Sequence, residues 1–124
     1  MTHYLTSQDL LWIAERLPGD PACDDLGVLD AAVARTHSRW MDQDVYASDW
    51  LRAAALLQTL VFHEPLEAHN KLFAWACAEA FLTANGHTLE YKPDDAISLV
   101  VAASTKALDV VALAADLKAL RGTT

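Results

Sequence analysis

The sequence has few of the residues that interrupt helices, and it has few cysteines. Its 124 residues include only four prolines, four glycines and two cysteines. Long stretches without proline or glycine favour helix, especially where alanine and leucine are common. Cys23 and Cys77 are too few for a disulfide framework and too isolated for a thiolate metal site. We therefore expect a helical protein whose stability depends on a packed apolar core.

Positive charge is also scarce. Lysine and arginine total 9 against 17 aspartates and glutamates, a formal net charge of −8. A protein that binds nucleic acid or an anionic membrane through charge needs a basic face, so neither partner is expected. Every apolar run ends before the roughly 20 residues that span a bilayer, and the start of the chain does not resemble a signal peptide. We expect one cytoplasmic domain over residues 1–124.

Capping residues and apolar periodicity predict about six helices. The segments 48–62 and 70–84 are apolar around almost their whole circumference, which is typical of buried helices. We expect these two segments to pair at the centre of an all-α bundle, with Asn85-Gly86 ending the second. The expected helix starts are Thr6 or Ser7, Asp24-Asp25, Ser48, Asn70, Asp94-Asp95 and Asp109.

The remaining segments have weaker patterns. Residues 37–47 have no clear period and are expected to form a loop, with a short helical piece as an option. Residues 88–91 alternate in polarity and predict a short extended arm. In the fifth helix, the spacing of Ile97, Val100, Val101 and Ser104 predicts one inward face.

One segment combines titratable and amide side chains between the two most apolar helices. It reads His63-Glu64-Pro65-Leu66-Glu67-Ala68-His69-Asn70-Lys71. The start of a buried helix presents free backbone N–H groups and a positive dipole end, which together favour an anion. A phosphate site and an ordinary polar connection both fit this pattern.

A longer set of residues, spaced along most of the chain, resembles the Doc (death-on-curing) branch of the Fic/Doc family. The similarity extends from Tyr4 almost to the C-terminus without a gap. It comprises Tyr4-Leu5-Thr6 with Asp9-Leu10-Leu11, residues 27–32 with Arg35, residues 53–57 with Leu60, Asn70-Lys71, Ala74-Trp75, Phe81-Leu82 and Asn85-Gly86.

The resemblance implies a compact helical fold with a central motif of the form H-P-F-x-D-G-N-K-R. In that family the histidine activates the acceptor hydroxyl and the acidic residue holds Mg²⁺. The asparagine, lysine, arginine and helix N-terminus grip the nucleotide phosphates. Most members transfer AMP, and Doc-type toxins phosphorylate elongation factor Tu and are neutralised by an antitoxin that folds onto them.

The motif is eroded in this chain. Asn70 and Lys71 match it, whereas the histidine, the acid, the glycine and the arginine are replaced, in that order, by Glu64, Ala68, His69 and Leu72. Loss of a general base costs roughly 10²–10⁴-fold in rate. Loss of a phosphate-clamping arginine costs roughly 10³–10⁵-fold. We therefore expect a catalytically impaired pseudo-enzyme that needs no cofactor and acts through protein binding in a toxin–antitoxin system.

The alternative is an active transferase that moves phosphate or AMP from Mg-ATP to a protein hydroxyl. A one-residue bulge at Pro65 would bring His63 to the base position and Glu67 to the acid position. The candidate catalytic residues are therefore His63, Glu64 and Glu67, and the candidate phosphate-binding residues are His69, Asn70 and Lys71.

No metal ligand is assigned. The H-E-x-x-H pattern of zinc hydrolases needs a second histidine at position 67, where this chain has glutamate. With a net charge of −8, the expected partner is a small antitoxin that presents a basic or amphipathic helical segment.

Overall fold

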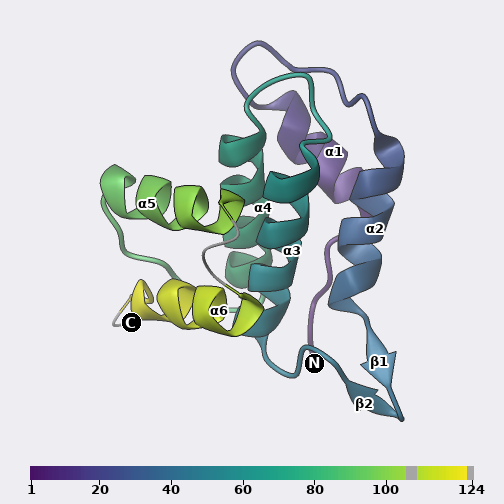
Figure 1. Ribbon diagram of the computed structural model, residues 1–124, viewed down its shortest axis with the longest axis vertical. Helices are drawn as coiled ribbons and strands as arrows, with labels where there is room; N and C mark the ends of the chain where they lie inside the picture. The colour runs from purple at the N-terminus through teal and green to yellow at the C-terminus, as the bar shows by residue number, and fades with distance from the viewer. Residues whose placement is uncertain (106–108, 123–124) are drawn as a thin grey trace.

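The computed structural model describes residues 1–105 and 109–122 (Figure 1). Within these residues the chain forms six helices and one two-stranded hairpin, which confirms the predicted mostly α-helical class. The elements are α1 (Ser7–Glu15), α2 (Leu26–Thr36), β1 (Arg39–Trp40), β2 (Gln43–Asp44), α3 (Asp49–His63), α4 (Asn70–Ala84), α5 (Pro93–Ser104) and α6 (Val110–Ala119).

Helix α3 is the centre of the bundle. It packs against α2, α4, α5 and α6, and its contact with α4 is the most extensive in the molecule. Figure 1 shows α3 and α4 side by side, with α1 and α2 to one side of them and α5 and α6 to the other. The predicted central pair is confirmed. Its fully buried large side chains include Leu56, Leu57, Leu60, Phe73, Phe81 and Leu82.

Three predicted caps fix the helix starts. Thr6 accepts a hydrogen bond from the Asp9 backbone N–H, and the Asp9 carboxylate accepts one from Thr6, so Thr6 rather than Ser7 caps α1. Ser48 caps α3 through the Leu51 N–H, and Asp109 caps α6 through the Ala112 N–H. Side chains that accept these otherwise free N–H groups stabilise a helix by about 1 kcal/mol each.

The segment 37–47 differs from the expectation of a loop or a short helical piece. It contains an antiparallel hairpin in which Arg39 pairs with Asp44 and Trp40 with Gln43. Met41 and Asp42 form the turn, and both have positive φ, 51° and 62°. Asn-Gly is the usual sequence signal for such a turn, so the Met-Asp sequence does not predict a hairpin here.

Helix α5 also differs from the prediction. It starts at Pro93, one residue before Asp94-Asp95, because proline fits the first helical position and Asp95 accepts from the Lys92 N–H. Its buried face is Ala96, Leu99, Val100 and Ala103. Ile97 and Val101, predicted to face inward, are 60% and 43% exposed.

The extended arm at 88–91 is too short to count as a strand. Leu89 forms an isolated bridge with Arg121, and the Glu90 N–H donates to the Leu120 carbonyl at 2.8 Å. This pairing ties the segment after α4 to the end of α6. In the described part of the chain, no helix has both the length and the apolar character that crossing a membrane requires.

Candidate functional site

The loop between α3 and α4 is held in place by the segment before α2. The Pro65 carbonyl accepts from the N–H groups of Asp24 and Asp25, at 2.8 and 3.2 Å. Glu67 donates its backbone N–H to the Ala22 carbonyl at 2.9 Å, and its carboxylate accepts from the Ala22 N–H at 3.0 Å. The loop is therefore a fixed part of the fold.

Two residues of this loop have left-handed backbone conformations. Glu64, which follows the last residue of α3, has φ 45°, and His69, which precedes α4, has φ 62°. A side chain is strained in this region, which glycine occupies freely. At position 69, where the family motif has glycine, this chain has an exposed histidine with a left-handed backbone.

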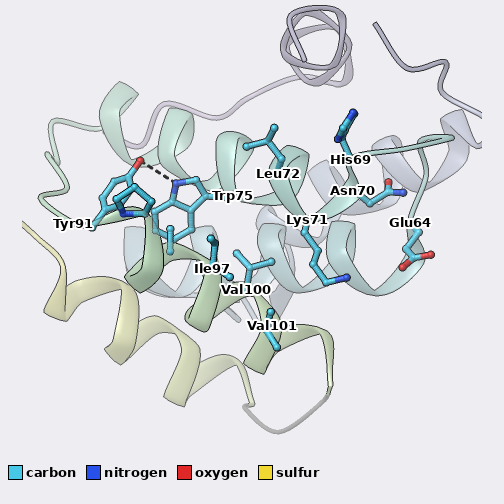
Figure 2. Close-up of a pocket in the computed structure, with 12 residues that line it drawn as sticks. Glu64, His69, Asn70, Lys71, Leu72, Trp75, Tyr91, Ile97, Val100 and Val101 are labelled. Carbon is cyan, nitrogen blue, oxygen red and sulfur yellow. Dashed lines mark hydrogen bonds between the residues drawn. The ribbon is translucent and has the colours of Figure 1, made fainter. Parts of the chain in front are cut away.

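The first turn of α4 opens on a cavity of about 730 Å³ between α4 and α5. Figure 2 shows Glu64 and Lys71 at one end and Trp75 with Tyr91 at the other, above Ile97, Val100 and Val101 of α5. Leu72, at the position of the family's arginine, lines the α4 side and is 46% exposed. The cavity is therefore lined mainly by apolar side chains.

A short hydrogen-bond chain closes the aromatic end of the cavity. The Trp75 indole N–H donates to the Tyr91 hydroxyl at 3.1 Å, and this hydroxyl donates to the Glu79 carboxylate at 3.1 Å. Burial raises the pKa of Tyr91, the Trp75 N–H lowers it, and the Glu79 carboxylate raises it further. Tyr91 is therefore held as a neutral donor, and Trp75 is fixed edge-on to it.

The predicted site residues do not all meet in this cavity. Glu64, His69, Asn70 and Lys71 line it. His63 is the last residue of α3 and lines a different cleft, and the Glu67 carboxylate is bound to the Ala22 backbone. Of the three candidate catalytic residues, Glu64 is therefore the one that lines the loop cavity.

The residues at the loop do not fit a Mg²⁺ ion bound with a nucleotide. The family's metal-binding acid is Ala68 here, and the neighbouring Glu67 carboxylate is occupied by a backbone N–H. No cluster of three or more metal-ligating side chains occurs among residues 1–105 and 109–122.

The structure thus defines a class of protein: a helical bundle whose central helix pair is joined by an ordered loop that lies beside a cavity at the first turn of α4. A curated relative then places the chain within that class. It is similar to the Toxin Doc of Mycolicibacterium smegmatis (strain ATCC 700084 / mc(2)155), with 38% identity over 120 residues, which cover 94% of this chain and 92% of the relative. The chain belongs to the Doc toxin branch of the Fic/Doc family, whose Doc members are toxins of toxin–antitoxin systems. No protein-family model matches it.

The sequence reasoning missed the apolar wall of the site. The sequence pattern places Tyr91 in an extended arm and Ile97 and Val101 on a buried helix face. Trp75 is buried, as expected for its helix, and also lines the cavity. The sequence of the fifth helix could have indicated this wall, because its apolar residues cover more than one face of the helix. A helix that is apolar on two faces presents one of them to a cavity, a partner or a second core.

Proposed function

We propose that this chain acts as the toxin-family member of a toxin–antitoxin pair through protein binding, and that nucleotide transfer is strongly impaired. One observation carries the proposal: the cavity at the α3–α4 loop is lined mainly by apolar side chains such as Leu72, Ile97 and Val101, with Lys71 as the one lysine or arginine among its described lining residues. A nucleotide needs several positive charges or N–H donors around its phosphates.

The charge of the site supports the same proposal. Lys71 is the single cation among the residues that line the cavity, and Glu64 lies at the same end of it. A carboxylate near the phosphates of ATP would repel them, at about 1 kcal/mol per pair of unit charges at 4 Å in water. The net charge of −8 makes the repulsion of a highly charged anion stronger at low salt.

A partner segment fits the cavity better. Its apolar side chains would cover Leu72, Ile97 and Val101, and a basic residue would face Glu64 or the two aspartates at the start of α5. Amphipathic helices bind grooves in this way, through side chains spaced at three and four residues. We infer that the partner is a small antitoxin with such a segment.

The partner is tested with the product of the reading frame that adjoins the gene. Isothermal titration should give tight binding to the wild-type chain. Ile97→Glu should weaken it at least about tenfold, because a charge would enter the apolar contact. Ser98→Glu is the matched control, since Ser98 is exposed on the same helix, does not line the cavity and adds the same charge.

The loss of transfer is tested separately. Titration with Mg-ATP should show no strong binding, and incubation with labelled ATP and a translation-factor acceptor should give no labelled product. Labelled product that disappears in His63→Ala would instead favour the active transferase. Equal effects of Ile97→Glu and Ser98→Glu would contradict the docking site and leave the question of transfer untouched.

A further inference from the structure

A second cleft, of about 380 Å³, shares no lining residue with the loop cavity. The residues around it come from α2, α3, α5 and the start of α6. They include Arg35, Gln58, Thr59, His63, Ala103 and Asp109. The proposed function does not use this cleft, so the inference below is independent of it.

Arg35 lies in this cleft with neutral hydrogen-bond partners. Its Nε donates to the Tyr46 hydroxyl at 2.8 Å, and its Nη2 donates to the side-chain Oε1 of Gln58 at 2.9 Å. Its Nη1 donates to the Thr59 hydroxyl at 3.0 Å and to the Ala55 carbonyl at 3.3 Å. No ion pair involves Arg35 in the part of the chain that the structure describes.

These contacts fix the guanidinium group but leave its charge unbalanced. A guanidinium has five N–H groups, and the four contacts leave one Nη2 N–H for a ligand. Arg35 is half-buried, so water screens its charge less than at an open surface. An arginine held rigid in this way is suited to bind a planar or tetrahedral oxyanion.

Two further groups contribute to the same cleft. His63 lines it and, among the described residues, its ring makes an edge-on contact with Phe62. Asp109 caps α6, so the positive end of this ten-residue helix is at the rim. We propose that the cleft binds a small ligand through a phosphate group, held by Arg35 and His63.

The Asp109 carboxylate repels a phosphate group bound in the cleft, so removing its charge tests the proposal. Asn caps a helix as well as Asp does, so Asp109→Asn should keep the fold and remove one negative charge from the rim. Phosphate should then bind roughly threefold to tenfold more tightly. Asp116→Asn is the matched control, because it removes the same charge from an exposed position of α6 outside the cleft.

The binding is measured by amide NMR during titration with inorganic phosphate at constant ionic strength. Saturable shifts are expected at the Arg35 Nε–H and in the first turn of α6, and His63→Gln should weaken the binding. A parallel titration with glycerol phosphate shows whether the ligand is free phosphate or a phosphate ester. The tighter-binding probe of the two identifies the type of phosphate that the cleft binds. Shifts confined to the first turn of α4, binding of neither probe, or equal effects of the two aspartate variants would overturn the proposal.

Discussion

The side-chain amide of Asn70 makes both of its hydrogen bonds to the backbone of Leu66. Its Oδ1 accepts from the Leu66 N–H and its Nδ2 donates to the Leu66 carbonyl, each at 2.9 Å. Leu66 is buried, so these backbone groups have little access to water. In this structure Asn70 therefore acts on its own loop, whereas the family resemblance assigns the motif asparagine to a nucleotide phosphate.

Replacing Asn70 tests this structural role. Asn70→Ala should lower the free energy of unfolding by about 1–3 kcal/mol, because two buried backbone groups would lose their partners. Urea denaturation measures the change. Lys71→Ala is the control, since Lys71 is the exposed neighbour in the same helical turn and should change stability by less than about 0.5 kcal/mol. Similar losses in both variants would contradict the role.

His69 offers a second test, because its backbone is strained. His69→Gly should raise the free energy of unfolding by roughly 0.5–1 kcal/mol, since glycine adopts φ 62° without the steric penalty of a Cβ atom. Thermal and urea unfolding measure the gain. Ala68→Gly is the control, because Ala68 is not among the residues with positive φ and should only lose backbone entropy. Destabilisation in both variants would show that the imidazole itself supports the fold.

The fold was largely predictable from sequence because its signals are local. Thr6, Ser48 and Asp109 each precede an apolar periodic segment, and each caps its helix in the structure. The hairpin at 39–44 was not predictable. It is stabilised by an ion pair within the hairpin, between Asp44 and Arg39 at 2.7 Å, and by a contact of Asp44 with Arg52 of α3 at 3.2 Å.

The site was predictable only in part. The loop was singled out through Asn70-Lys71, and the structure places Glu64, His69, Asn70 and Lys71 along one cavity. The apolar wall was missed because period alone cannot tell which of two apolar faces of α5 packs inward. Spacing also gives no hint of the contact between the His87 Nε2 and the Asp49 carboxylate at 2.9 Å, because Asp49 lies 38 residues earlier in the chain.

Tyr91 should titrate above the usual tyrosine pKa of about 10. Because its pKa is raised in the folded state, its contribution to stability is complete below the unfolded pKa and is lost as the pH rises above it. Glu79→Gln should lower the Tyr91 pKa, since it removes a carboxylate that disfavours the phenolate. Trp75→Phe should raise it, since it removes the N–H that favours the phenolate.

Ultraviolet absorbance measures these shifts, with Tyr91→Phe identifying the signal of Tyr91 among the three tyrosines. Urea denaturation at increasing pH provides the second reading, and wild-type stability should decline more steeply above about pH 10 than that of Tyr91→Phe. Shifts of the same sign in Glu79→Gln and Trp75→Phe would contradict the hydrogen-bond chain.

Restoring the family motif tests whether the lost side chains explain an impaired site. The combined variant Glu64→His, Ala68→Asp, His69→Gly and Leu72→Arg would supply the base, the acid, the glycine and the clamp of the family motif in a loop that lies beside the cavity. Each restored charged contact should improve Mg-ATP affinity by about tenfold, the equivalent of about 1.4 kcal/mol. Isothermal titration against the wild-type chain measures the gain.

Two partial variants separate the contributions. Leu72→Arg alone should increase affinity for ATP without Mg²⁺, because it adds a phosphate contact and no metal ligand. Ala68→Asp alone should add no affinity in the absence of Mg²⁺, since a carboxylate without a cation repels the phosphates. A fully restored variant that folds and still fails to bind Mg-ATP would show that the apolar wall of Trp75, Ile97 and Val101 excludes the nucleotide by shape. The loss of the motif side chains would then follow from the shape of the cavity. If the cavity cannot admit a nucleotide, side chains in the loop that would bind its phosphates have no function.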